Sequence, residues 1–191
     1  VHLDTAHNYL RGRSEEVIGQ VVKGRPRDSF VVATKVPPAE GFNEKLDLSL
    51  KRLGLDYVDI LYLHNLTKRE VALAPENMAM IQAAKKAGKA RFIGVTTHGN
   101  EPEVIRAAVE AKIYDVVLTG YNFRKDYIKD LDAAIEEATA AGLGIIAMKT
   151  LAGGFWDKQR TQPINTKAAL KWAMNNAKVT TSVPGMTTFD Q

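Results

Sequence analysis

Short apolar segments rich in β-branched residues recur along the chain. There are seven of them, at residues 1–6, 30–35, 58–64, 90–96, 116–122, 144–149 and 180–185. Their starts are 26 to 36 residues apart, and a segment such as 30–35 shows no alternation of polar and apolar positions. Continuous apolar runs of this length are typical of strands covered on both faces, as in a parallel sheet. The pattern therefore predicts seven parallel strands.

The segments between these strands have the spacing of amphipathic helices. Leu46, Leu50 and Leu53 recur at i, i+4 and i+7, and Gly54 follows them where a left-handed residue can end a helix. Ser14 is expected to cap the helix that precedes the second strand. Strands and helices that alternate at this period form either a doubly wound open sheet or a (β/α)8 barrel.

The barrel is the expected architecture. An open sheet that binds a dinucleotide usually has G-x-G-x-x-G after an early strand, and this chain does not. A closed barrel has eight strands, whereas this chain starts inside the first of seven and stops just after the last. We therefore expect residues 1–191 to form a single, partial TIM-barrel domain, a fragment that lacks the first βα unit and the last helix.

Composition and charge limit the classes of function. The 191 residues are 45% hydrophobic and 25% charged, as in soluble globular proteins, and no apolar run approaches the roughly 20 residues of a membrane helix. The 26 basic and 22 acidic residues give a net charge of +4, without a basic stripe interleaved with aromatic residues. Neither a membrane nor a nucleic acid is therefore an expected partner, and small anionic ligands are favoured.

The chain contains no cysteine, which excludes disulfides, thiolate nucleophiles and cysteine-ligated metals from it. No other metal site is expected, because His2, Asp4 and His7 lack further ligands at other strand ends. We expect a cytoplasmic protein. The periplasm is the alternative, because the sequence does not begin at an initiating Met. The oligomeric state is left open.

Polar residues close the first three predicted strands. Asp4, Lys35 and His64 each end an apolar run, and Tyr9 follows Asp4 by five residues. The carboxyl ends of parallel strands carry the active site in both architectures, so these side chains are expected to converge. Singly, each has an ordinary structural explanation, such as a capping Asp or a core His. Together they form a set suited to the reduction of a carbonyl group.

The chemistry of hydride addition explains why such a set is useful. A hydride that adds to an aldehyde or ketone builds negative charge on the oxygen, which needs a proton donor beside it. Tyr9 is the expected acid, and the Lys35 ammonium is expected to stabilise its phenolate. Asp4 is expected to hold that ammonium, and His64 to orient the carbonyl.

Several ordered motifs resemble those of the aldo-keto reductases, most closely a divergent bacterial branch. They are Asp4-Thr5-Ala6 with Tyr9, Gly12-x-Ser14-Glu15, Val32-Ala33-Thr34-Lys35, Leu61-Tyr62-Leu63-His64, Arg91-Phe92-Ile93-Gly94-Val95-Thr96, Tyr121-Asn122, residues 146–154 and Val183-Pro184-Gly185-Met186. Together they span nearly the whole chain. The resemblance implies a (β/α)8 barrel that binds a nicotinamide cofactor in extended form, and it implies that Asp4, Tyr9, Lys35 and His64 occupy the catalytic positions.

The resemblance also implies a cofactor and the residues that contact it. NADPH is the expected cofactor, NADH is the alternative, and the substrate is a small carbonyl compound. The residues at the family's cofactor-binding positions are Thr96, Thr97, Lys149, Leu151, Gly185, Met186 and Thr187. The chain departs from the family at Leu118, where the family has Gln, and at Met148, where an aromatic residue often stacks on the nicotinamide.

Two other functions remain open from the residues alone. Lys35 and Lys149 both lie at predicted strand ends, where a lysine can act as a Schiff-base nucleophile in an aldolase-like barrel. The departures at Leu118 and Met148 are compatible with a regulatory or structural barrel that binds the cofactor without turnover.

Overall fold

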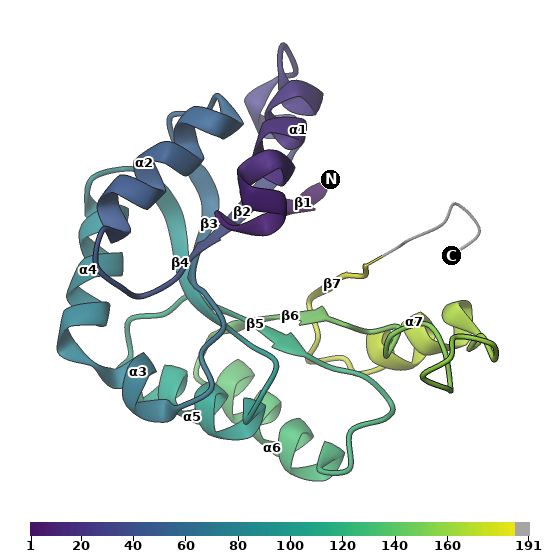
Figure 1. Cartoon of the computed structure of the whole chain (residues 1–191). Coiled ribbons are helices and arrows are strands. Elements are labelled where there is room, and N and C mark those ends of the chain that lie inside the picture. Colours follow the sequence, from purple (N-terminus) through teal and green to yellow (C-terminus); the bar gives the residue numbers. More distant parts are fainter. Residues whose placement is uncertain (186–191) are drawn as a thin grey trace.

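The computed structural model describes residues 1–185 and contains the seven predicted parallel strands. They are β1 (His2–Asp4), β2 (Val31–Val36), β3 (Val58–Leu63), β4 (Ala90–Thr97), β5 (Val116–Gly120), β6 (Gly144–Met148) and β7 (Thr181–Val183). Each strand pairs with the next one in the sequence, so the sheet order is β1 to β7. The sheet curves into a nearly closed barrel with the helices on its outer side (Figure 1). The predicted barrel architecture is thus confirmed.

Helices connect successive strands, as the apolar spacing predicted. The α-helices are α1 (Arg13–Val22), α2 (Phe42–Leu53), α3 (Arg69–Leu73), α4 (Pro75–Lys86), α5 (Glu101–Ala111), α6 (Ile128–Ala140) and α7 (Thr166–Met174). Two short 3-10 helices, η1 (Tyr9–Gly12) and η2 (Arg27–Ser29), precede α1 and β2. Gly54 ends α2 in the left-handed conformation, with a φ of +64°.

The apolar core has two layers, one on each face of the sheet. The outer layer fills the space between strands and helices and includes the fully buried Leu46, Ile81 and Leu131. The inner layer lies inside the barrel and includes Leu118 and Tyr62. Burying a Leu or Ile side chain completely stabilises a fold by about 1.5–3 kcal/mol. The double coverage explains why the strands have continuous apolar runs.

Within residues 1–185, β1 and β7 are the two edge strands, since each pairs with a single neighbour. Both strands line a cavity of about 1000 Å³, together with the loops that follow β5 and β6. The loops that follow the carboxyl ends of parallel strands all lie at the same end of a barrel. The cavity is therefore reached by residues that follow the carboxyl ends of several strands.

Helix α1 begins differently from the prediction. Its N-cap is Gly12, with a φ of +94°, and Ser14 lies inside the first turn. The Ser14 hydroxyl accepts a hydrogen bond from the Thr5 hydroxyl at 2.8 Å and thus ties α1 to the residue after β1. The predicted cap was wrong because this tertiary contact, and not the local backbone, engages the serine.

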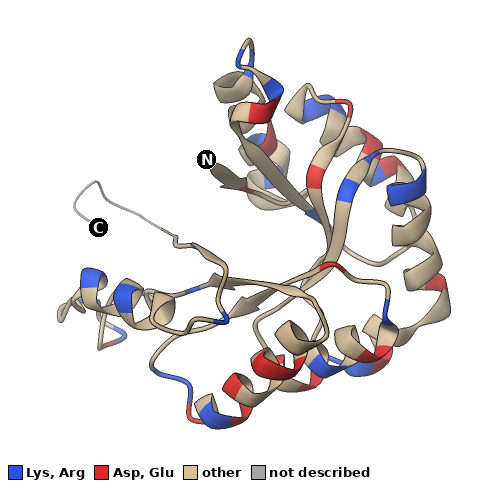
Figure 2. Cartoon of the chain, turned by 180° about the vertical axis from the view of Figure 1, so that it is seen from behind, with Lys and Arg blue, Asp and Glu red and all other residues tan. Residues whose placement is uncertain are grey.

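Charged residues of both signs lie along the outer helices (Figure 2). Arg106 of α5, for example, forms ion pairs with Asp130 and Glu137 of α6 at 2.8 and 3.1 Å. Among residues 1–185, no helix combines the length and the apolar character that crossing a bilayer requires.

Candidate active site

Asp4 and Lys35 form an ion pair at the carboxyl ends of neighbouring strands. Asp4 ends β1, whose register pairs it with Ala33 of β2, two residues before Lys35. The Lys35 Nζ donates to Asp4 Oδ2 at 2.6 Å and to the Thr5 carbonyl at 2.5 Å. The lysine is only 1% exposed. The structure thus holds an ammonium group inside the barrel, at the end where its loops converge.

Burial and charge act in opposite directions on this pair. Burial raises the pKa of Asp4, and the positive charge of Lys35 opposes that shift. Burial also lowers the pKa of Lys35, and the negative charge of Asp4 opposes that shift. Each group therefore depends on the other to remain charged, because a lone ion at such a depth would lose most of its hydration.

Tyr9 and His64 lie beside this pair. The Lys35 Nζ is 5.0 Å from the centroid of the Tyr9 ring. The rings of Tyr9 and His64 meet edge to face, with centroids 5.7 Å apart and an interplanar angle of 73°. Tyr9 is 40% exposed, and together with Asp4 it lines the 1000 Å³ cavity. The four residues singled out from the sequence thus come together from β1, η1, β2 and the end of β3.

The protonation states of the two rings follow from their surroundings. Burial and the negative charge of Asp4 raise the pKa of Tyr9, so its hydroxyl keeps its proton near neutral pH. Burial, the positive charge of Lys35 and the neighbouring His98 lower the pKa of His64 to about 4, so its imidazole is neutral near neutral pH. In this structure the hydrogen bonds of Lys35 go to Asp4 and to the Thr5 carbonyl, and its Nζ lies over the Tyr9 ring.

Three of the predicted cofactor contacts line the same cavity. They are Lys149 and Leu151, which follow β6, and Gly185, which follows β7. The backbone of Gly153 and Gly154, with φ values of +88° and +81°, forms part of its wall. Residues with a side chain rarely adopt such φ values, so glycine suits both positions. The Gly154 N–H donates to the Leu151 carbonyl at 2.7 Å, and its carbonyl accepts from the Ile164 N–H at 3.0 Å, so the loop after β6 is closed by its own backbone. Met186 and Thr187 lie outside the described residues.

The remaining two predicted contacts, Thr96 and Thr97, are buried at the end of β4. The Thr96 hydroxyl accepts a hydrogen bond from the backbone N–H of Asn65 at 2.8 Å. The Thr97 hydroxyl donates to the Gly99 carbonyl at 2.9 Å. The lining of the 1000 Å³ cavity includes Met148 but neither threonine, and Leu118 lies inside the barrel.

The structure adds polar residues that the sequence did not single out as site residues. Asn122, Arg124 and Arg160 line the cavity. The Asn122 amide donates to the Lys149 carbonyl at 3.1 Å, and Arg124 donates to the Phe155 carbonyl at 3.0 Å, so the loops after β5 and β6 are fastened together. Asn122 could have been found, since it closes the fifth apolar run as Lys35 closes the second.

Arg160 had no comparable signal, because it lies eleven residues beyond the predicted strand end at 149. Its guanidinium lies 5.3 Å from the centroid of the Phe155 ring. With Arg124 and Lys149 it gives the wall of the cavity next to β6 a positive charge. Within residues 1–185, no three His, Asp or Glu side chains come together as metal ligands do.

Comparisons with known proteins agree with this arrangement. The profile of the Aldo/keto reductase family matches residues 1–168. An L-galactose dehydrogenase of Arabidopsis thaliana is 27% identical over 98% of this chain, which spans 70% of that enzyme. An L-glyceraldehyde 3-phosphate reductase of Escherichia coli K12 is 30% identical over 80% of this chain, and there the match spans 49% of the enzyme.

A solved structure shares the fold. It is an aldo-keto reductase from Klebsiella pneumoniae in complex with NADPH, which superimposes with a TM-score of 0.77 at 22% sequence identity. The superposition covers 97% of this chain and 69% of that one. The family profile covers most of the sequence, and the barrel and the order of its strands agree with it. The chain belongs to the aldo/keto reductase family.

Proposed function

We propose that the protein reduces an aldehyde or ketone with NADPH as the hydride donor. The observation that carries the proposal is the convergence of Asp4, Tyr9, Lys35 and His64 beside one cavity. Membership of the aldo/keto reductase family supports it, as do the relatives named as a dehydrogenase and a reductase.

Each residue has a defined task in that reaction. When hydride adds to the carbonyl carbon, the π electrons move to the oxygen, and the Tyr9 hydroxyl supplies the proton that makes the alcohol. The neutral His64 imidazole has one N–H, which can donate to the same oxygen and so orient the substrate. Lys35, held by Asp4, places a positive charge near the phenolate that Tyr9 becomes. Solvent can then return a proton to Tyr9, which is 40% exposed.

The cavity suits a dinucleotide. A bound reduced nicotinamide cofactor supplies the hydride. Lys149, Arg124 and Arg160 line the wall next to β6, and their positive charges match a diphosphate. Gly153, where an added Cβ would meet no atom within 4 Å, offers room for close approach of such a group. NADPH is proposed over NADH because the similar Klebsiella pneumoniae enzyme was solved with NADPH.

A Schiff-base role for Lys35 is less well supported. Burial lowers its pKa, which favours a lysine nucleophile. Its Nζ, however, donates to Asp4 and to the Thr5 carbonyl, and the carboxylate favours the protonated form, which cannot attack a carbonyl carbon. Borohydride reduction in the presence of an aldehyde tests this directly. The proposed reductase gives no adduct at Lys35 by mass spectrometry.

The proposed function is tested with the purified chain. NADPH and NADH are titrated by fluorescence, a reactive aromatic aldehyde is added, and loss of the reduced cofactor's absorbance is followed. Binding with turnover supports the proposal. Binding without turnover of any aldehyde or ketone in a broad panel favours the regulatory barrel instead, and a folded sample that binds neither cofactor contradicts both.

A further inference from the structure

The backbone that carries Tyr9 is strained. We define the Tyr9 loop as residues 5–12, which join β1 to α1. Leu10 and Arg11 have φ values of +50° and +57°, and Gly12 follows with +94°. Residues with side chains rarely adopt this region, and two in succession persist only where surrounding contacts hold them. Leu10 is largely exposed, so its own side chain does not anchor the loop.

Arg52, in the last turn of α2, supplies such contacts. Its Nη1 donates to the His7 carbonyl at 3.0 Å and to Glu15 Oε2 at 3.2 Å. Its guanidinium also lies directly against Gly12, because a Cβ built on that glycine would be 2.2 Å from the guanidinium carbon. One side chain therefore contacts the loop two residues before Tyr9 and three residues after it.

The partner of Arg52 is itself anchored to β2. Glu15 is fully buried, and its Oε1 accepts a hydrogen bond from the Thr34 hydroxyl at 2.7 Å. Thr34 immediately precedes Lys35 in β2. The contacts thus run from α2 through Arg52 and Glu15 to the strand that holds the catalytic lysine.

His7 is fastened on three sides. Its backbone N–H donates to the Lys35 carbonyl at 3.0 Å, its carbonyl accepts from Arg52, and its ring Nδ1 lies 3.0 Å from the hydroxyl of the fully buried Ser49. Ser49 and Arg52 both belong to α2. The start of the Tyr9 loop is therefore held between β2 and α2.

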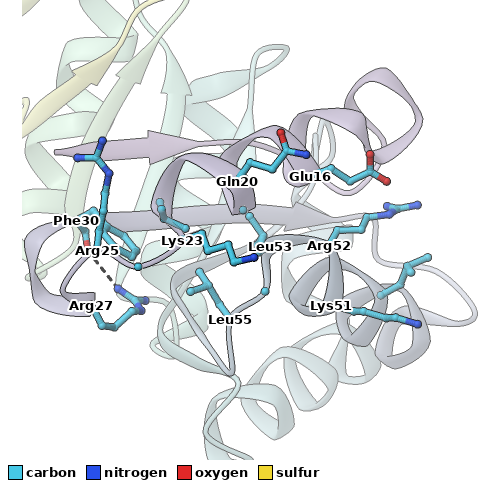
Figure 3. A pocket seen from close by; sticks show the side chains of 15 residues that line it. Glu16, Gln20, Lys23, Arg25, Arg27, Phe30, Lys51, Arg52, Leu53 and Leu55 are labelled. Atoms are coloured by element: carbon cyan, nitrogen blue, oxygen red, sulfur yellow. Dashed lines mark hydrogen bonds between the residues drawn. The ribbon is translucent and has the colours of Figure 1, made fainter.

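Helix α2 packs closely against α1 and so holds Arg52 in a fixed position. A Cβ built on Gly19 of α1 would lie 2.6 Å from the carbonyl oxygen of Arg52, so the two helices touch through their backbones. Figure 3 shows Arg52 between Glu16 of α1 and Lys51 of α2, on the wall of a second cavity of about 850 Å³. Close backbone contact leaves little room for α1 to slide, so a contact from α2 can fix the loop accurately.

We propose that Arg52 is a positioning residue for Tyr9. By binding the His7 carbonyl and Glu15 across Gly12, it holds the Tyr9 loop so that the phenol stays beside Lys35 and His64. The proposal rests on the proposed function, in which Tyr9 is the acid. It assigns a task in catalysis to a residue that does not line the 1000 Å³ cavity.

The test replaces Arg52 with lysine. Arg52→Lys keeps the charge that Glu15 needs but loses the planar guanidinium that packs against Gly12 and places Nη1 between its two acceptors. We expect kcat to fall about 10- to 100-fold, because a displacement of about 1 Å at a reacting group has effects of that size. KM for the aldehyde and the NADPH dissociation constant should stay within about twofold, since the wall next to β6 is unchanged.

Arg106→Lys is the matched control. Arg106 also joins two helices by ion pairs, but α5 and α6 are not the helices that hold the Tyr9 loop. Its kcat should equal that of the parent. A parent-like kcat in Arg52→Lys, counted per NADPH-binding site, would overturn the proposal.

A second readout separates this proposal from the proposed function. The chain is labelled with 3-fluorotyrosine, and the fluorine NMR signal of Tyr9 is assigned by its loss in Tyr9→Phe. We expect that signal to shift and broaden in Arg52→Lys and to stay unchanged in Arg106→Lys. An unchanged signal in both contradicts the positioning role. Lack of carbonyl reduction by the parent contradicts the proposed function and leaves the NMR result valid.

A double variant covers the case in which Arg52→Lys does not fold. Arg52→Met with Glu15→Gln removes both charges together, so no uncompensated buried charge remains. It also removes the hydrogen bond to the His7 carbonyl, so the same loss of kcat and the same change in the Tyr9 signal are expected. A parent-like kcat with a parent-like signal overturns the proposal here too.

Discussion

The end of the barrel at which the strands have their carboxyl ends, which we call the barrel mouth, has two halves. The half near β1 to β3 and the half near β5 and β6 differ in how they hold their polar groups. Near the ends of β1 and β2, the polar side chains that surround the Tyr9 loop are mostly buried and bonded to one another, as Lys35 is to Asp4 and Glu15 is to Thr34. At the ends of β5 and β6, the cations Lys149, Arg124 and Arg160 are exposed. One half is built from fixed partners and the other from accessible charges.

The difference matches the two tasks of the site. A group that moves a proton in the transition state must be held to within a fraction of an ångström, which requires a network of buried hydrogen bonds. A group that binds a charged cofactor has to remain accessible from solvent, and it still functions when salt screens part of its charge. Substitutions in the first half should therefore change kcat or stability strongly, and those in the second half should change affinity weakly.

The largest effect is expected for Tyr9→Phe. Loss of the acid should lower kcat by about 10²- to 10⁴-fold, while NADPH affinity stays the same. Steady-state kinetics and fluorescence titration measure the two quantities. Tyr57→Phe is the control, because Tyr57 precedes β3 at the opposite end of the barrel and packs on Arg27. Equal rates for Tyr9→Phe and the parent would show that another group supplies the proton.

Lys35→Met should destabilise the fold most. It leaves the Asp4 carboxylate without its cation among buried groups, which costs about 3–5 kcal/mol. Urea unfolding at neutral pH measures the loss. Lys89→Met is the matched control: Lys89 pairs with Asp47 on the surface, and removal of such a pair costs about 0–1 kcal/mol. Similar losses in the two variants would contradict the contrast between the buried pair and ordinary surface pairs.

Arg160→Gln should weaken NADPH binding by about two- to fivefold at low salt, and by less at high salt, as expected for one screened charge. At saturating NADPH, kcat should not change. Lys158→Gln, in the same loop but outside the cavity lining, should leave the dissociation constant unchanged at both salt concentrations. A large loss of kcat in Arg160→Gln would place this half of the mouth in the chemical step.

The smallest effect concerns pH. The pKa of His64 is lowered to about 4 in the folded chain and returns to its ordinary value of 6.5 on unfolding. Below pH 6.5 the unfolded chain therefore binds the extra proton, so this contribution to stability is complete above pH 6.5 and is lost as the pH falls toward 4. Thermal melts of the parent and His64→Gln over that range measure it. The parent should lose more stability than the variant, and parallel curves would contradict the assignment.

Much of the buried half could be predicted from the sequence. Residues such as Lys35 and His64 end continuous apolar runs, and parallel strands bring their carboxyl ends together. The spacing of the apolar runs and the place of each polar residue at the end of a run were therefore sufficient to predict that these side chains converge. The contacts of Arg52 were not predictable, because they depend on where α2 packs against the Tyr9 loop. The same is true of Ser14, whose hydroxyl bonds Thr5 and does not cap the helix.

The exposed half was harder to predict for a different physical reason. Arg160 lies far along a loop, and its place in the cavity wall depends on contacts such as that of Arg124 with the Phe155 carbonyl.

The protonation of Tyr9, in the buried half, also depends on geometry. Burial and the nearby Asp4 raise the pKa of Tyr9, and neither effect could be inferred from the order of residues along the chain.

The most direct test of the account follows the hydride itself. The parent and Tyr9→Phe are each incubated with an aromatic aldehyde and NADPH deuterated at the transferring position of the nicotinamide, and the product is examined by NMR. The account predicts an alcohol with deuterium on the former carbonyl carbon, formed rapidly by the parent and at least about 100-fold more slowly by Tyr9→Phe. An alcohol without deuterium, or equal rates of deuterium transfer by the two proteins, would contradict it.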